Sequence, residues 1–352
     1  MANTYLTRTP SSSGNRLKWT WSGWTKRGTD NQDLMLFSAY QNSSYNTYLK
    51  FALGGEIRFA DVYNGSDQAK INTLAKFRDL SAWYHIVVVY DKNNSTSTDR
   101  LIIYVNGVRI TDFDGSIMPS QSTTFNVANI AMQIGAFNAG SNFNGSMSHV
   151  HFSDGYALAP TVFGSTDSVT GEWQINTDPT FTLGTNGFSI LKDGNTITDQ
   201  SSNSNNFSLG GGTLTKTEDN PSNVFACGNV LGSGSVSFSN GNNSVHEGGT
   251  SFKTAIATLG ASSGKYYAEV KVPSIGGVTY GLYTGFVNLD KTNLPNLTSN
   301  VGDTADSAGI SSGGGYIYYN GQQFTGATTA TTANDIVNLA MDLDNGRLYW
   351  GI

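Results

Sequence analysis

Acidic side chains are the groups in this sequence that could cleave a glycosidic bond. Retaining glycoside hydrolysis needs two carboxylates about 5 to 5.5 Å apart across the scissile bond, which one strand can supply as an alternating E-x-D-x-E pattern. The chain has no such pattern, and no two of its glutamates fall within one strand: Glu56, Glu172, Glu218, Glu247 and Glu269. The sequence therefore predicts that the protein is not an enzyme.

Histidine and cysteine are the residues that could form a transition-metal site. His149 and His151 lie two positions apart in an alternating segment, so on a strand both rings point to one face. A zinc site needs one or two further ligands, and the remaining candidates are His85, His246 and the single cysteine, Cys227. We interpret the pair as inward, satisfied histidines or an outward polar stripe, and favour both over a zinc ligand pair.

Aromatic side chains could stack on sugar rings. Tyr316, Tyr318 and Tyr319 precede an Asn-Gly pair that begins at Asn320 and is typical of a hairpin tip, where β-sandwiches carry recognition. These four residues are the candidate ligand-binding residues. Tryptophans on alternating strands are more often part of the core, and we expect this for Trp21 and Trp83.

Strands must position these residues. Trp83–Asp91 and Leu101–Ile110 are runs of β-branched and aromatic residues, and the second contains an Asn-Gly pair suited to a two-residue turn. Lys18–Lys26 alternates aromatic and polar residues but changes phase at Gly23, which predicts a bulge or bend there. Comparable segments recur along the chain, so we predict an all-β protein built from antiparallel sandwiches.

Composition and charge exclude several classes of function. The chain has 352 residues, 41 glycines and 13% charged residues, which favours sheets with neutral polar faces and a length suited to two domains. A net charge of −6 with dispersed Lys and Arg excludes a nucleic-acid footprint. No segment approaches the apolar length needed to insert into a membrane, and the N-terminus has no apolar signal-peptide core.

Two families resemble the two halves of the chain. The patterns W-x-H-x-x-x-x-Y-D at Trp83 and L-x-x-Y-V-N-G at Leu101 resemble laminin-G/pentraxin-like domains, a branch of the concanavalin A-like jelly rolls. Further along, G-K-Y-Y-x-E-V at Gly264 and V-x-L-A-M-D-L-D-N-G-x-L-Y-W at Val337 look like a SPRY domain. The SPRY pattern normally continues, so we expect a second sandwich that is truncated at Ile352 or completed by something else.

The order of these motifs, with D-x-S-x-N-x-N-N-F at Asp199 between them, resembles virion structural proteins of marine tailed bacteriophages. The resemblance implies two concanavalin-like jelly rolls: a laminin-G-like domain at 1–175, a turn-rich connector with short strands at 176–225, and a SPRY-like sandwich at 226–352. Related laminin-G and pentraxin sites hold calcium with loop carboxylates, which makes Asp112, Asp114 and Asp154 the candidate calcium ligands.

The expected function is that of a surface-exposed tail or head fibre or decoration component, localised in the virion after synthesis in the host cytoplasm. Its expected partners are other virion proteins and a host-surface glycan or protein, and it is expected to act as a homo-oligomer, with a trimer favoured, because weak sites need multivalent display. The alternative is a purely structural capsid or tail cement protein that does not bind the host.

Overall fold

The structure is a computed structural model that describes residues 3–192, 194, 196–230, 232–233, 236–247, 253–275, 282–288, 301–312, 314–324 and 330–352. The chain divides into two compact units, one comprising Met1–Ala226 with Ser239–Asn243 and the other Cys227–Phe238 with Ser244–Ile352. The described residues are strands and loops with two single-turn 3-10 helices, η1 (Ser97–Asp99) and η2 (Pro160–Val162). No helix among them has the length and apolarity to span a membrane.

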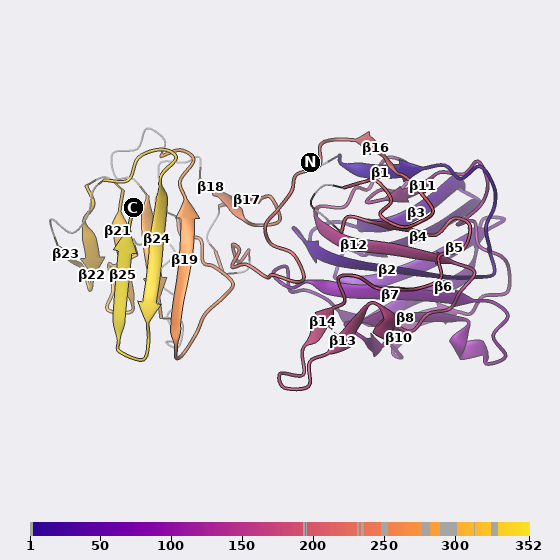
Figure 1. The fold of residues 1–352 in the computed structure, drawn as a ribbon, viewed down its shortest axis with the longest axis horizontal. Helices are drawn as coiled ribbons and strands as arrows, with labels where there is room; N and C mark the ends of the chain where they lie inside the picture. Colours follow the sequence, from indigo (N-terminus) through magenta and orange to yellow (C-terminus); the bar gives the residue numbers. More distant parts are fainter. Residues whose placement is uncertain are drawn as a thin grey trace. The chain divides into compact units, whose positions relative to one another are not determined.

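The first unit is a large antiparallel β-sandwich (Figure 1). Its eight-stranded sheet has the order β10 (Phe113–Ile117), β6 (Ser66–Lys76), β5 (Glu56–Tyr63), β4 (Tyr45–Phe51), β3 (Leu34–Asn42), β11 (Met132–Ile134), β1 (Tyr5–Arg8) and β16 (Ser208–Gly211). Its six-stranded sheet has the order β15 (Phe188–Ile190), β12 (Gly145–Asp154), β2 (Lys18–Arg27), β7 (Tyr84–Asp91), β8 (Leu101–Val105) and β9 (Val108–Arg109). The prediction of an all-β fold built on an antiparallel sandwich is therefore confirmed.

Alternation along each strand supplies the core between the two sheets. Trp19 is fully buried, stacks on Tyr90 with ring centroids 5.3 Å apart, and packs edge-on against Phe37. Trp21 is also fully buried and Trp83 is 8% exposed, so the expectation of buried tryptophans holds at both positions.

Strand β2 differs from its sequence-based prediction at Gly23. The register between β2 and β7 runs without a break from Lys18 to Thr25, so β2 has no bulge at the glycine. Gly23 instead makes room for the indole of Trp21, because a Cβ there would lie 2.6 Å from that ring. The bulge is in the partner strand β12, where the pairing shifts beyond Ser148 and His149 adopts a φ of +49°.

Residues 176–225, predicted to be a connector, lie within the first compact unit. Strand β15 joins the six-stranded sheet, β16 joins the eight-stranded sheet, and Phe188 and Phe207 belong to the same hydrophobic core as Trp19. Asp219 is buried as well, and forms an ion pair of 2.7 Å with Lys26. The segment therefore closes this sandwich, since burying its aromatic side chains removes them from water.

A short hairpin and a covering segment complete the first unit. Strands β13 (Gly164–Thr166) and β14 (Trp173–Ile175) pair with each other, and Phe163 packs on Val87 and Val89 of β7. The outer side of the six-stranded sheet is therefore partly covered, which explains why both faces of β2 and β7 are buried.

The second unit contains two further antiparallel sheets. Strands β19 (Lys265–Lys271), β24 (Ile336–Asp342) and β25 (Arg347–Gly351) form one, and β20 (Tyr283–Val287), β21 (Ser307–Ser311), β22 (Ile317–Tyr319) and β23 (Gln322–Phe324) form the other. Val337 and Leu339 of the first sheet pack with Ile310 of the second. Strands β17 (Ser237–Ser239) and β18 (Ser244–His246) form a separate two-stranded sheet.

Candidate functional site

The N-terminal strand β1 brings distant parts of the sequence together at one edge of the first unit. Leu6 is buried in the core and anchors the strand between β11 and β16. The neighbouring Thr7, on the opposite side of the strand, pairs with Gln133 on β11 and with Ser208 on β16. The pairing places the residues that follow β1 close to the loop that precedes β16.

The loop before β16 is held in one conformation by Asp199. Its Oδ1 accepts hydrogen bonds from the backbone N–H groups of Ser189 at 2.8 Å and Ser201 at 3.0 Å. Its Oδ2 accepts from Ser201 Oγ at 2.8 Å and from the N–H of Asn205 at 2.7 Å. The Asn203 side chain ties the loop to the preceding turn by donating to the carbonyls of Gly184 at 2.6 Å and Gly187 at 3.0 Å. The D-x-S-x-N-x-N-N-F pattern therefore encodes a rigid loop.

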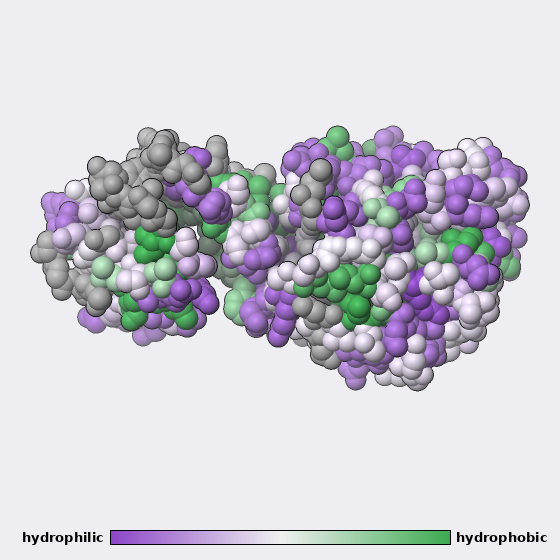
Figure 2. Space-filling model, turned by 90° about the horizontal axis from the view of Figure 1, so that it is seen from above, coloured by the Kyte–Doolittle hydropathy of each residue, from purple (hydrophilic) through white to green (hydrophobic). Residues whose placement is uncertain are grey.

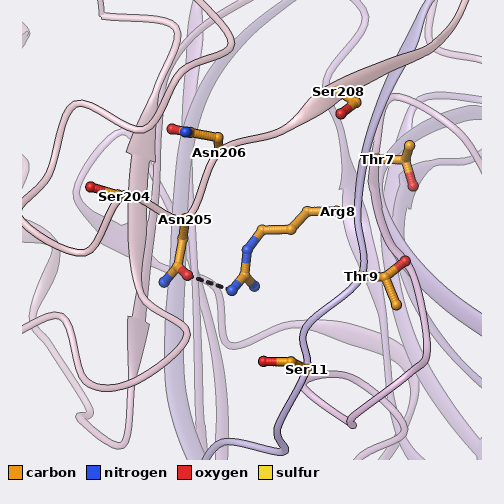
Figure 3. Close-up of a pocket in the computed structure, with 8 residues that line it drawn as sticks. All are labelled: Thr7, Arg8, Thr9, Ser11, Ser204, Asn205, Asn206 and Ser208. Carbon is orange, nitrogen blue, oxygen red and sulfur yellow. Dashed lines mark hydrogen bonds between the residues drawn. The ribbon is translucent and has the colours of Figure 1, made fainter.

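A polar hollow of about 430 Å³ lies between this loop and β1 (Figure 3). All eight of the residues that line it are polar, and none is a carboxylate: Thr7, Arg8, Thr9, Ser11, Ser204, Asn205, Asn206 and Ser208. Five of them present hydroxyl groups that have no hydrogen-bond partner among the described residues: Thr7, Thr9, Ser11, Ser204 and Ser208. The hollow thus gathers neutral groups that can both donate and accept hydrogen bonds.

Arg8 is the charged residue of the hollow. Figure 3 shows its side chain crossing the hollow toward Asn205. Its Nη2 donates to Asn205 Oδ1 and, at 3.3 Å, to Asn186 Oδ1. Burial lowers the pKa of the guanidinium, while the charges of Asp199 and Asp154 oppose that shift. A guanidinium keeps its proton at neutral pH, so the hollow carries a fixed positive charge.

Asp154, one of the predicted calcium ligands, occupies a different kind of environment. It is 4% exposed, and its Oδ1 accepts from the N–H of Asn15 and from Asn126 Nδ2, both at 2.7 Å. Its Oδ2 accepts from the N–H of Asn186 at 2.9 Å. The carboxylate holds three loops together, because its three donors come from three separate segments of the chain.

The other two predicted calcium ligands lie at the edge strand β10 and just before it. Asp112 is exposed, and Asp114 accepts a hydrogen bond from Asn72 Nδ2 at 3.4 Å. Within the part of the chain that the structure describes, no three His, Cys, Asp or Glu side chains form a group that could hold a metal ion. The structure thus does not bring the three carboxylates together, and calcium binding stays a prediction.

The predicted tyrosine site lies on the β22–β23 hairpin of the second unit. Asn320 and Gly321 both have positive φ, +51° and +71°, as the two-residue turn requires. Tyr318 is packed edge-on against Tyr283 at 5.3 Å and donates to Gln323 Oε1 at 3.0 Å. Tyr319 is 48% exposed and Tyr316 is half-buried, and ligand binding at this hairpin stays a prediction.

The histidines of the six-stranded sheet are buried and hydrogen-bonded. His151 Nδ1 lies 2.9 Å from Ser189 Oγ, and His149 Nδ1 lies 2.7 Å from Ser148 Oγ. His85 bridges Ser22 Oγ, 2.8 Å from Nε2, and the indole N–H of Trp173, 3.0 Å from Nδ1. Burial lowers the pKa of His85 to about 3, so the ring is neutral at pH 7. These contacts agree with the interpretation of the two histidines as satisfied, but His151 packs against Phe163 and Phe181 on the covered outer side of the sheet and does not point into the core between the sheets.

Sequence reasoning did not find the hollow. Its signal was present in two places, as the run of hydroxyl residues from Thr7 to Ser13 and as the Ser- and Asn-rich segment after Asp199. Each segment alone resembles an ordinary polar loop, because only the pairing of β1 with β16 brings the two together.

Comparisons with known proteins concern mainly the first unit. Residues 2–162 match the family model described as the concanavalin A-like lectin/glucanases superfamily. The match supports the expectation of a concanavalin A-like domain of the laminin-G type in the N-terminal part of the chain. No curated protein sequence matches the chain.

Several solved structures show a loose likeness. The native heptameric SAP-like pentraxin from Limulus polyphemus is 18% identical over 45% of this chain and 72% of that chain, with a TM-score of 0.32. A putative carbohydrate binding protein from Bacteroides ovatus is 14% identical over 62% of this chain and 58% of that chain, with a TM-score of 0.42. Domains LG4-5 of the mouse laminin alpha1 chain are 10% identical over 96% of this chain and 70% of that chain, with a TM-score of 0.34. At these values the likenesses do not assign a ligand or a partner to this chain.

Proposed function

We propose that this protein is a non-catalytic glycan-binding protein and that the polar hollow beside β1 is a glycan-binding site. The observation that carries the proposal is that five of the eight residues lining one hollow of the first unit carry hydroxyl groups without a hydrogen-bond partner among the described residues. Sugars present many hydroxyl groups at close spacing, and a lining that both donates and accepts can pair with them in either direction. The hollow is also large enough for a sugar residue, since small-molecule sites begin at about 300 Å³.

Preorganisation supports the same proposal. Strand β1 is fixed on both sides by sheet pairing, and the opposite wall is fixed by the four hydrogen bonds to Asp199. A rigid lining loses little conformational entropy when a ligand binds. This favours binding at a shallow site, where each hydrogen bond contributes little free energy.

The chemistry of the lining supports binding without hydrolysis. The family description covers both lectins and glucanases, so it leaves that question open. A hydrolase needs a carboxylate pair at the bound sugar, and the eight lining residues include no Asp or Glu.

The test is a glycan array followed by titration of the best ligand against the full chain. The variant Thr9→Val with Ser11→Ala removes two hydroxyl groups, with little change in volume, and each lost bond is worth about 0.5–1.5 kcal/mol. We expect the affinity to fall by about tenfold. The matched control is Thr177→Val, an exposed threonine elsewhere in the same unit, which should leave the affinity unchanged. Equal affinities for all three proteins would contradict the assignment of this site.

We further propose that the protein is a surface component of a tailed-phage particle, where repeated copies add avidity to weak sites. The support is the order of motifs along the chain, from the laminin-G-like segment to the SPRY-like segment. The alternative is a structural cement protein of the same particle. The position of the chain in a reconstructed particle, together with binding of the isolated protein to host cells, separates the two roles. Light scattering tests the expected trimer.

A further inference from the structure

We infer that the hollow beside β1 selects acidic sugars, and that the guanidinium of Arg8 receives their carboxylate or sulfate group. This inference rests on the proposed glycan-binding function and names the class of ligand. Arg8 is the single charged residue among the eight that line the hollow. An arginine presents paired N–H donors in one plane, a geometry that matches the two oxygens of an anionic group.

One atom of Arg8 lacks an acceptor. Its Nη1 is buried and has no hydrogen-bond partner among the described residues, whereas Nη2 is held by Asn205 and Asn186. A buried donor without an acceptor is uncommon in folded proteins and calls for a water, an ion or a ligand to complete it. Since Arg8 lines the hollow, a small shift of the guanidinium toward the hollow would let an anionic oxygen bound there supply the missing acceptor.

The two carboxylates whose charges act on Arg8 do not accept a hydrogen bond from its Nη1. Asp199 accepts four hydrogen bonds from the loop that it holds, and Asp154 accepts three from the segments that it joins. Their charges support the ionised state of Arg8, but their oxygens are committed to other donors. The two carboxylates therefore hold the walls of the hollow in place, and the donor Nη1 has no acceptor among the described residues.

The net charge of the chain opposes the binding of acidic glycans. The net charge is −6, so the protein as a whole repels polyanions. A preference for an acidic glycan must then come from a local site rather than from the overall charge.

The experiment uses the full chain and three polysaccharide probes in affinity electrophoresis: alginate for carboxylates, dextran sulfate for sulfates and dextran as the neutral comparison. We expect at least one polyanion to be bound about tenfold more tightly than dextran, with an affinity that falls as salt is added. The two polyanions show which of the two anionic groups is preferred.

The decisive variants are Thr9→Asp and Thr9→Asn, which have nearly the same shape and differ by one negative charge at the rim of the hollow. We expect Thr9→Asp to bind the polyanions at least tenfold more weakly than Thr9→Asn, because both variants lose the Thr9 hydroxyl group and only the first adds a negative charge. Arg8→Gln should abolish the preference over dextran, and its thermal unfolding reports whether the fold is kept. Because the Thr9 pair changes an exposed position, the test does not depend on Arg8→Gln folding.

The outcomes separate this inference from the proposed function. Equal losses in both Thr9 variants, or dextran bound as tightly as the polyanions, overturn the acidic-sugar inference and leave glycan binding standing. Failure to bind any polysaccharide, together with a blank glycan array, overturns both.

Discussion

The two units of this protein share an all-β construction but differ sharply in how much they bury. In the first unit, both sheets contribute to one continuous core rich in aromatic rings, with Trp19, Trp21 and Phe125 among its fully buried members. In the second unit, the buried hydrophobic cluster of the described residues consists of Val272, Ile310, Val337 and Leu339. Several of its aromatic side chains are about half exposed: Tyr266, Tyr267, Tyr319, Phe324 and Tyr349.

This difference shows where the protein can hold a precise site. Each Å² of buried apolar surface contributes about 25 cal/mol, so the first unit has far more stabilisation with which to fix its loops. The hollow uses that rigidity, because its walls are a strand anchored by Leu6 and a loop closed by Phe207, both members of the large core. Figure 2 shows one face of this unit, on which hydrophilic residues surround separate hydrophobic patches.

The largest expected effect is a loss of stability in the first unit when its core is opened. Trp19→Ala should lower the free energy of unfolding by about 3–5 kcal/mol, because the indole is fully buried among five other aromatic rings. Leu339→Ala in the second unit should cost about 2 kcal/mol, since its smaller core can relax around the lost atoms.

Urea denaturation followed by tryptophan fluorescence measures this contrast. Trp350 is the one tryptophan of the six that belongs to the second unit, so fluorescence reports mainly on the first unit, and hydrogen exchange of the β24 amides reports on Leu339→Ala in the second. Val169→Ala is the control, because that side chain is 91% exposed. An equal loss of unfolding free energy in Leu339→Ala and Trp19→Ala would contradict the proposed difference between the two cores.

The next effect concerns the buried ion pair between Lys26 and Asp219, whose side chains are 1% and 2% exposed. Asp219 also accepts from the indole N–H of Trp83 at 3.2 Å and from the N–H of Phe225 at 2.9 Å. Asp219→Ala should cost about 3 kcal/mol, because it leaves a buried ammonium group without its carboxylate.

Adding Lys26→Met to Asp219→Ala should restore part of that loss, since the unpaired charge is then removed. Both variants are read by urea denaturation and by proteolysis of the segment near Asp219. Resistance of Asp219→Ala to both would show that this segment contributes little to the stability of the first unit.

Acid should destabilise the first unit through His85. Burial holds the pKa of His85 at about 3 in the folded state, against about 6.5 when unfolded. The unfolded state therefore takes up the proton first, so stability present above pH 6.5 is lost as the pH falls toward 3. Between pH 7 and pH 5 the parent protein should lose about 2 kcal/mol of unfolding free energy relative to His85→Gln, which lacks the titrating ring. Urea denaturation of both proteins at the two pH values measures this change.

The second unit provides the internal control for this pH dependence. Among its described residues, the carboxyl groups with a shifted pKa are Asp335 and Asp342. Both are solvent-exposed, and hydrogen bonds hold both pKa values below the usual range. A pH dependence of equal size in the unfolding of that unit would count against a role for the buried histidine.

The smallest effect has the opposite sign and comes from Asp61. Burial raises the pKa of this carboxyl group to about 6, although Thr47 Oγ1 and the N–H of Thr124 donate to it. The folded state therefore takes up the proton first, and stability rises as the pH falls from 6 toward 3.9. Between pH 7 and pH 5 the parent protein should gain about 1 kcal/mol relative to Asp61→Asn. A flat difference across this range would place the pKa of Asp61 near its usual value.

Much of the fold followed from local sequence patterns. The Asn-Gly pairs at Asn106 and Asn320 predicted tight hairpin turns, and all four residues have the positive φ that such turns need. The runs of β-branched and aromatic residues at Trp83–Asp91 and Leu101–Ile110 predicted strands of an antiparallel sheet, and β7 and β8 do pair. These features are readable because a turn or a strand depends on residues that are neighbours along the chain.

The candidate site was decided by tertiary structure. The hydrogen bond from Arg8 to Asn205 joins residues 197 positions apart, and no local pattern specifies which strand becomes the partner of β1. The same reason explains Asp154, which has the sequence context of a loop ligand but becomes a buried junction because three segments converge on it. Periodicity determines which face of a strand is buried, whereas the order of strands in a sheet depends on the packing of the whole core.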